Sequence, residues 1–306
     1  LNFRIDYKNT FAGNHNVLAT FVHNRQYYHG TSLSAYANTF YTNAIHQLQK
    51  GDAASITASN GESEQASMGF VGRIRYDYAN RYMIEFSGRY DGSDCFPKGN
   101  RFGFFPSVSA GWSLSDEKFF SPLKEKGIFD YFKVRGSYGI IGINGANHDA
   151  YAYLPTYNYN SNAYVIGGEM VNSVTPGVTP SIFLTWYTRR KTDVGFDFAT
   201  LNNRLEGSFD WFYETTKGYL VSPNYEYTDP IGYSLPQVVS DAEDRIEGLD
   251  GLIKYKDNIG AVEYSLGVNF TWYRSIAAKT NEDKVTLSNP YIRAQGYIKD
   301  YLASMS

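Results

Sequence analysis

The stretch MGFVGRIRYDYANRYMIEFSGRYD, residues 68–91, decides the fold. Every second side chain from Met68 to Tyr78 is apolar, aromatic or glycine, and the pattern resumes at Tyr82 and continues to Tyr90. The residues between them are mostly charged or polar. Alternation with a period of two is typical of a β-strand whose two faces meet different surroundings. The sequence therefore predicts a long hairpin that turns at residues 79–81.

The apolar face of this predicted hairpin carries tyrosine at both ends. Tyr78 and Tyr82 flank the turn, and Tyr90 lies at the far end. A soluble sandwich would favour Val, Leu and Ile on its buried face, whereas strands that cross a membrane carry aromatic girdles at both interfaces. The pattern therefore favours strands that cross a bilayer. On this interpretation the side chains that face hydrocarbon include Phe70, Ile74, Phe86, Phe209 and Val268.

The same alternation recurs along the chain and predicts about ten strands, many with roughly the 9–11 residues that a tilted membrane strand needs. The predicted connections are short near 9–14, 79–81, 200–204 and 257–261, with a compact segment at 115–130 in which Pro122 is expected to break a short helical turn. They are long near 28–66, 92–103, 141–183, 216–241 and after 273. Outer-membrane barrels have short periplasmic turns and long extracellular loops. The sequence therefore predicts an all-β, antiparallel, up-and-down transmembrane β-barrel.

Composition supports this class. The 306 residues include 28 Tyr, 20 Phe and 4 Trp, yet the mean hydropathy is −0.41. No run of about 18 apolar residues occurs, so a spanning helix is not predicted, and a closed barrel is the other way to cross a bilayer. The net charge is −3 with both signs well mixed, which argues against a nucleic-acid partner. The single cysteine, Cys95, has no partner for an internal disulfide and is interpreted as an incidental loop residue.

Several motifs carry a family resemblance. They are RYDGS at 89–93, FFPS at 104–107, GW at 111–112, KVRGSYG at 133–139 and DVGFDFATLNNRLEGSFDWFYETTKGYLV at 193–221. Together they resemble the SusC/RagA family of TonB-dependent transporters of Bacteroidetes, from Met68 to about Trp272. Cys95 departs from that pattern, because the family more often has a small or basic residue there. Residues 244–251 also depart, because the family's Asn-x-Gly-x-Glu pattern is blurred in them.

The resemblance implies a barrel of about 22 strands, of which residues 1–306 would form an incomplete, C-terminal portion. The plug domain, the TonB box and the closing strands are expected to be absent from this sequence. The implied function is active import of a bulky nutrient, a glycan (oligosaccharide) or a peptide, across the cell outer membrane. The implied partners are a surface lipoprotein of SusD type, the TonB complex through the N-terminal region, and outer-membrane lipid.

Two sets of residues are candidates for the functional site. The first set would face the lumen as charges, either lining a substrate path or pairing with one another and with the plug: Arg73, Arg75, Asp77, Glu85, Arg89 and Asp91. The second set combines flat aromatic faces with amide groups in a predicted loop, a mixture suited to sugar rings or peptide: Tyr153, Tyr157, Asn158, Tyr159 and Asn160. Packing of these tyrosines loop against loop is the plainer interpretation.

Catalysis, cofactors and metals are not predicted. The five histidines show no HExxH spacing, no GxSxG elbow occurs, and residues 281–283 do not reach calcium-loop spacing. Three alternatives remain open at this point: a secreted or surface all-β carbohydrate-binding or adhesion protein with a soluble sandwich, a passive porin, and, least favoured, an outer-membrane enzyme.

Overall fold

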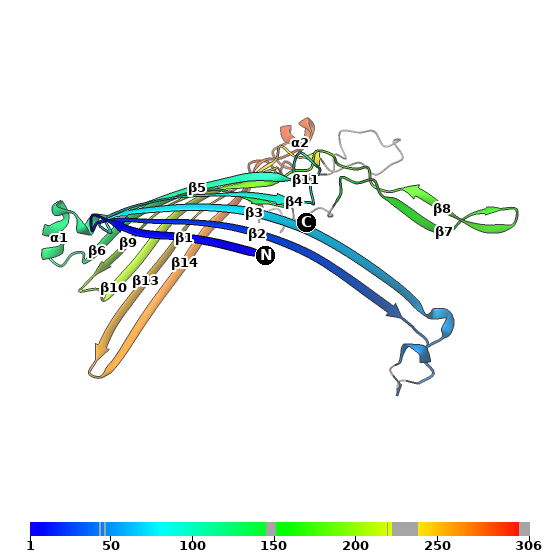
Figure 1. Cartoon of the computed structure of the whole chain (residues 1–306), viewed down its shortest axis with the longest axis horizontal. Coiled ribbons are helices and arrows are strands. Elements are labelled where there is room, and N and C mark those ends of the chain that lie inside the picture. Colours follow the sequence, from blue (N-terminus) through cyan, green and yellow to red (C-terminus); the bar gives the residue numbers. More distant parts are fainter. Residues whose placement is uncertain (43, 46, 145–150, 219, 222–237, 300–306) are drawn as a thin grey trace.

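Ten long strands form one antiparallel sheet in the computed structural model, which describes residues 1–42, 44–45, 47–144, 151–218, 220–221 and 238–299 (Figure 1). The sheet order is β1-β2-β3-β4-β5-β6-β9-β10-β13-β14. The strands are β1 (Asn2–Phe11), β2 (His15–Tyr36), β3 (Thr57–Tyr78), β4 (Tyr82–Ser93), β5 (Phe102–Ser113), β6 (Tyr131–Ile143), β9 (Tyr187–Thr200), β10 (Leu205–Lys217), β13 (Glu243–Ile259) and β14 (Val262–Lys279). This confirms the predicted class, an antiparallel up-and-down sheet that forms part of a barrel wall.

The strand registers place the apolar residues in continuous rows on one face. Ile74 on β3 lies opposite Phe86 on β4, and Phe86 lies opposite Val108 on β5. Further along the sheet, the rings of Phe196 and Phe209 lie 5.4 Å apart between centroids. Because side chains alternate between faces with a period of two, one correct register fixes the face of every residue in a strand. The amphipathic pattern of each strand therefore adds up to one apolar face across the whole sheet.

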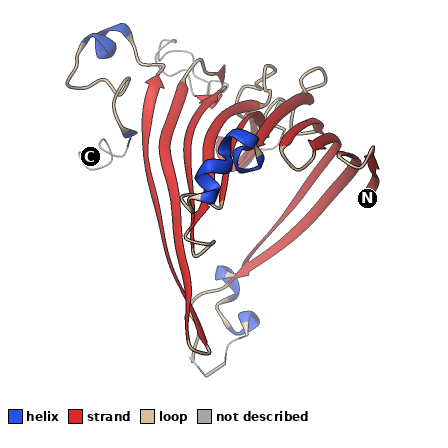
Figure 2. Cartoon of the chain, turned by 90° about the vertical axis from the view of Figure 1, so that its left-hand side faces the viewer, coloured by secondary structure: helices blue, strands red, loops and turns tan. Residues whose placement is uncertain are grey.

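No second sheet covers this apolar face in the described part of the chain. Ile74 is 56% exposed, Phe86 is 54% exposed and Val268 is 69% exposed. Figure 2 shows a single curved layer of strands. The soluble-sandwich interpretation is therefore wrong for this sheet, since a sandwich would bury these side chains against a second layer. The apolar face has the composition of a surface in contact with lipid.

One end of the sheet carries the short connections. The β3–β4 connection, residues 79–81, has positive φ at Ala79 and Asn80, and the Arg81 N–H donates to the Tyr78 carbonyl at 2.9 Å, as in a type I′ turn. The rings of Tyr78 and Tyr82 lie 6.3 Å apart, and Trp112 is 6.2 Å from Tyr82. These rings form the aromatic girdle expected at a membrane interface.

Short helical turns lie between β5 and β6 at this end: η3 (Leu114–Asp116), η4 (Lys118–Phe120) and α1 (Ser121–Glu125). Pro122 occupies the first turn of α1, where proline is tolerated because that N–H has no partner in the helix. The expectation that Pro122 breaks the turn was therefore wrong. Among the described residues, no helix combines the length and the apolar character that crossing a membrane would require.

The other end of the sheet carries the long connections, and one of them differs from prediction. Residues 28–66 were expected to form a loop, but β2 and β3 stay paired as far as Tyr36 and Thr57. Only residues 37–56 connect them, with η1 (Leu48–Lys50) and η2 (Ala53–Ser55). The extended hairpin is exposed on both faces. Without two different surroundings, a strand has no reason to alternate apolar with polar residues.

Two smaller hairpins lie in the other long connections. They are β7 (Tyr157–Ile166) with β8 (Glu169–Pro176), and β11 (Leu220–Val221) with β12 (Val238–Val239). The β7–β8 hairpin projects beyond the sheet on the same side as the extension of β2 and β3 (Figure 1). We call these two projections the arms. A short helix, α2 (Lys284–Ser288), follows β14 and begins at Asp283, whose carboxylate accepts the Thr286 N–H.

A charge placed on the apolar face tests which medium bathes it. Phe86→Arg should lower the free energy of unfolding by about 2–4 kcal/mol, the penalty for arginine on the lipid face near the bilayer midplane. The matched control is Ser109→Arg, on the polar face beside Glu85, and it should cost less than about 1 kcal/mol. Urea unfolding of the full-length protein in lipid vesicles measures both, and equal costs would contradict the assignment of faces.

Candidate functional site

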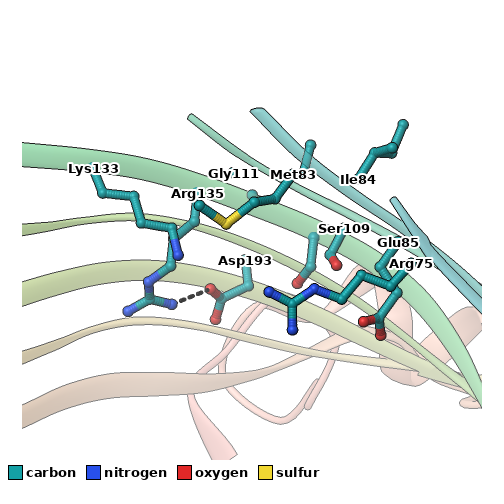
Figure 3. A pocket seen from close by; sticks show the side chains of 12 residues that line it. Arg75, Met83, Ile84, Glu85, Ser109, Gly111, Lys133, Arg135 and Asp193 are labelled. Carbon is teal, nitrogen blue, oxygen red and sulfur yellow. Dashed lines mark ion pairs between the residues drawn. The ribbon is translucent and has the colours of Figure 1, made fainter. Parts of the chain in front are cut away.

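The face opposite the apolar one is lined by charged and polar side chains, and we call it the polar wall. Arg73 Nη2 lies 2.6 Å from Glu85 Oε2, and Arg89 Nε lies 3.0 Å from Asp91 Oδ2. Arg75 lines, together with Glu85, a cavity of about 260 Å³ (Figure 3). The predicted lumen charges therefore share one face, and four of the six form two ion pairs.

Asp77 is the exception among the predicted lumen charges. It lies on the same face but is 6% exposed. Its carboxylate accepts hydrogen bonds from Asn16 Nδ2 at 3.1 Å and from the Asn80 N–H at 3.0 Å. Its partners hold the β3–β4 turn, so Asp77 contributes to the turn rather than to an open surface.

A charge cluster around Arg135 on β6 is the densest part of the polar wall. Its guanidinium lies 2.7 Å from Asp210 Oδ2, 3.3 Å from Asp197 Oδ1 and 3.8 Å from Asp193 Oδ1. The dashed line in Figure 3 marks the Asp193 pair. Lys191 adds a second cation, with Nζ 3.9 Å from the other oxygen of Asp193. The cluster thus adds side-chain ion pairs to the backbone hydrogen bonds that already join β6, β9 and β10.

A glycine makes this convergence possible. Gly195 lies between Arg135 and Asp210 in the cross-strand row. Strands are about 4.8 Å apart, so side chains on two strands with a third between them ordinarily do not meet. A Cβ at Gly195 would lie 1.9 Å from Asp210 Oδ1, so the space that a side chain would occupy is used by the carboxylate. Arg135 and Asp210 therefore pair across the intervening strand.

Arg135, Asp193, Asp197 and Asp210 stand at polar positions of the alternating sequence pattern, but they were not among the predicted site residues. The alternation gave their face correctly. It did not give their proximity, which depends on the register of β6, β9 and β10 and on the glycine between them. Among the described residues, no group of three or more His, Cys, Asp or Glu side chains is arranged to hold a metal ion.

The predicted ligand residues fall into two separate places. Tyr153 lies at the base of the β7–β8 arm, where its hydroxyl donates to the Asp94 carbonyl at 3.2 Å and accepts from Arg101 Nη2 at 3.4 Å. The hydroxyl of neighbouring Tyr151 lies 2.7 Å from Asp94 Oδ2 and 3.0 Å from the Glu64 carbonyl oxygen, and these two acceptors share its single hydrogen. We call Asp94, Tyr151 and Tyr153 the latch, because they fasten this arm to the sheet. Tyr153 thus packs loop against loop.

The other four predicted ligand residues lie on β7 itself. Tyr157 is 69% exposed and Tyr159 is 67% exposed, and Asn158 is exposed as well. Asn160 donates from Nδ2 to Thr175 Oγ1 at 3.0 Å, across to β8. Three of the four side chains are therefore exposed, although the Tyr159 hydroxyl accepts from Asn172 Nδ2 and Asn160 is used in part to hold the hairpin together.

The latch rests on an apolar cluster where β5 and β6 separate. Phe96 and Leu184 are fully buried, and Cys95 is 3% exposed. The ring of Trp186 lies 5.2 Å from Phe96, and its Nε1 donates to the Arg101 carbonyl at 3.0 Å. Cys95 is thus a packed residue of this cluster, which joins the β4–β5 connection to the segment before β9.

Removing the cation at the centre of the Arg135 cluster should destabilise the wall. Arg135→Met leaves three carboxylates without their shared partner, and we expect a loss of about 1–3 kcal/mol in the free energy of unfolding. The control Lys133→Met changes a cation that lines the same cavity and should cost under about 0.5 kcal/mol. Urea unfolding in lipid vesicles measures the free energy of unfolding of both variants. If Arg135→Met lost no more than Lys133→Met, the ion pairs of the cluster would not stabilise the wall.

Loosening the latch should expose the β7–β8 arm to proteases. Tyr151→Phe removes the hydroxyl whose hydrogen Asp94 and the Glu64 carbonyl share, at a net cost of about 0.5–1.5 kcal/mol, so cleavage within β7–β8 should accelerate. Tyr157→Phe, on the exposed face of the arm, should leave the cleavage rate unchanged.

The pH dependence of cleavage gives a second test of the latch. Burial, and then the hydrogen bond to Asp94, raises the pKa of Tyr151. The latch is therefore fully formed below about pH 10, the ordinary tyrosine value, and weakens progressively as the pH rises from there towards the raised pKa of Tyr151. Cleavage of the wild-type arm that is independent of pH through this range would contradict the latch.

The chain matches the protein family described as TonB dependent receptor-like, beta-barrel, over residues 1–302. It is 30% identical over 229 residues to TonB-dependent receptor SusC of Bacteroides thetaiotaomicron, covering 74% of this chain and 22% of that protein. TonB-dependent receptor P3 of Formosa agariphila is 29% identical over 262 residues, covering 81% of this chain and 23% of that protein. The chain therefore spans less than a quarter of the length of these curated relatives.

Solved structures agree with the fold. The RagAB peptide importer in the 'open-open' state superposes with a TM-score of 0.77 at 21% identity, covering 92% of this chain and 30% of that chain. The 'closed-closed' state gives a TM-score of 0.73 at 20% identity, covering 91% and 30%. The sequence and fold matches together confirm the resemblance to SusC and RagA that the motifs predicted. The chain belongs to the TonB-dependent receptor β-barrel family, and its sheet lies in the outer membrane.

Proposed function

We propose that the protein imports a bulky nutrient, an oligosaccharide or a peptide, across the outer membrane with energy supplied through TonB. The observation that carries the proposal is the family match over residues 1–302. The two-faced sheet agrees with it, because an apolar outer face and a charged inner wall are what a lumen in a bilayer requires. The chemistry of this part of the protein is binding and passage rather than bond breaking.

The wall needs further strands to close. β1 and β14 are the two edge strands of the sheet among the described residues. Unpaired backbone N–H and C=O groups are too costly to face lipid, so we propose that other strands of the same barrel pair with both edges. A plug domain inside the closed barrel would meet the polar wall, including Arg73 and Glu85, and would receive the TonB complex through the N-terminal region.

The arms fit a role in capture outside the membrane. A surface lipoprotein of SusD type is the proposed partner that delivers the nutrient, and the arms lie on the side of the long connections, where such a partner would sit. The exposed side chains of Tyr157, Asn158 and Tyr159 combine aromatic faces with an amide and a hydroxyl, which suit a sugar or a peptide. The polar wall then forms the path inward.

A passive porin is the second candidate, since it would have the same two-faced sheet. Uptake by cells with and without TonB separates the two. Active import predicts that growth on the transported nutrient is lost when TonB is deleted and returns when it is restored on a plasmid. Growth unaffected by the deletion would establish the porin and refute energy-coupled import. The control is a small nutrient that enters through general porins, whose use should not change.

A further inference from the structure

A second cavity lies on the polar wall, at the end that bears the arms. Its volume is about 460 Å³, within the range of about 300–1,000 Å³ that is typical of small-molecule sites. On one side it is lined by the side chains of β2, β3 and β4. On the other side it is lined by Phe105 and Trp186. Neither Asn24 nor Trp186, which contribute to the two sides, was among the residues predicted to bind ligand.

The polar side of the cavity is built over a glycine. Asn24 on β2, Gly69 on β3 and Asp91 on β4 lie in one cross-strand row. A Cβ at Gly69 would lie 2.3 Å from Asp91 Oδ1 and 2.6 Å from Asn24 Oδ1. The absence of a side chain at Gly69 therefore lets an amide and a carboxylate from the two flanking strands converge on one point.

The hydrogen-bonding groups at this point are not all used within the protein. Asn24 Oδ1 is buried without a hydrogen-bond partner among the described residues. With the opposite orientation of the amide, its N–H faces the Asp91 carboxylate. Gln26 and Ser67 add an amide and a hydroxyl to the same lining. The cavity thus offers both donors and acceptors.

The charges in the cavity cancel. Both guanidinium contacts of Arg89 go to Asp91, with Nε at 3.0 Å and Nη2 at 3.3 Å. The Arg89 guanidinium disfavours binding of a metal ion at the Asp91 carboxylate. The Asp91 carboxylate in turn disfavours binding of an anion at Arg89. A neutral ligand rich in hydroxyl groups meets both without leaving a charge unpaired.

The other side of the cavity is apolar and aromatic. Pairing of β5 with β6 ends at Ser107 and Gly139, although both strands continue. The ring of Phe105 fills the space between them, so that a Cβ at Gly142 would lie 1.9 Å from it. Trp186 meets Phe105 edge to face at 5.3 Å. Since the Trp186 N–H is already bonded to a carbonyl, its contribution to the cavity is apolar surface.

We propose that this cavity is a subsite for a neutral sugar ring of the imported ligand. A sugar ring carries hydroxyl groups at its edge and apolar C–H groups on its faces, which match the amide and carboxylate side and the aromatic side respectively. The site lies below the arms on the proposed path inward. The inference rests on the proposed import function and names the oligosaccharide as the substrate class.

Gly69→Ala tests the subsite with little risk to the fold. The added methyl group displaces only the ends of two side chains, Asn24 and Asp91, and no backbone. The matched control is Gly72→Ala on the same strand. Gly72 lies on the apolar face, and a methyl group added there would meet no atom within 4 Å. The probes are neutral oligosaccharides of glucose, galactose or mannose, with peptides of similar mass for comparison. Calorimetry on the full-length protein in detergent measures each affinity.

We expect at least one oligosaccharide to bind. Gly69→Ala should lower its affinity roughly tenfold, which corresponds to the loss of one to two hydrogen bonds. Gly72→Ala should leave the affinity unchanged. Asn24→Ala should weaken binding to a similar degree. Three outcomes would overturn the subsite: no oligosaccharide bound, only peptides bound, or equal affinities for the two alanine variants. TonB-dependent growth that persists under any of these outcomes would leave the import function standing and remove only the subsite.

Discussion

Backbone hydrogen bonding in a medium without water is the constraint on which the rest of this structure depends. Each N–H and C=O in the spanning part must be paired, and in the ten-stranded antiparallel sheet every strand from β2 through β13 is hydrogen-bonded to a neighbour on each side. Once the backbone is paired in this way, the side chains are free to serve two media at once. One face carries Ile74, Phe86 and Val268 toward lipid, and the other carries Arg73, Glu85 and Arg135. The function proposed for the wall uses only the polar face. That face can line a lumen because the apolar face is in contact with lipid.

Glycine between two larger residues is a device that the sheet repeats. Gly69 lets Asn24 and Asp91 converge, and Gly195 lets Arg135 reach Asp210. On the apolar face, Gly251 lies between Phe209 and Phe270, whose rings come within 5.9 Å across the strand between them. In each case the middle strand provides a gap of one side chain, and residues about two strand spacings apart come into contact. Such contacts tie three strands together, which pairwise cross-strand contacts do not.

The sequence predicted the part of the fold that faces two media and missed the part that does not. Alternation placed the spanning strands and their faces, and the motifs identified the family. It failed at residues 28–66, because an extended hairpin in water on both sides needs no alternation. The alternation is consistent with the face of Arg135 and Asp210 but could not reveal that they meet, since that depends on which residues of three strands share a row. Asp77 was assigned to the correct face, yet its hydrogen bonds to a turn follow from its place beside the hairpin connection.

The distribution of paired and unpaired groups suggests how such a wall passes a ligand without trapping it. Passage requires contacts strong enough to admit a ligand and weak enough to release it. Most charges on the wall are already neutralised by neighbours, as in Arg73 with Glu85 and Arg135 with Asp210. On the proposed function, a passing ligand would therefore meet dipoles and paired ions rather than a single strong charge. The exposed aromatic rings of Tyr157 and Tyr159 lie on an arm beyond the sheet, fastened by the latch rather than built into the wall. On the proposed import function, the exposed rings that would capture a ligand are therefore separated in space from the polar wall along which it would pass.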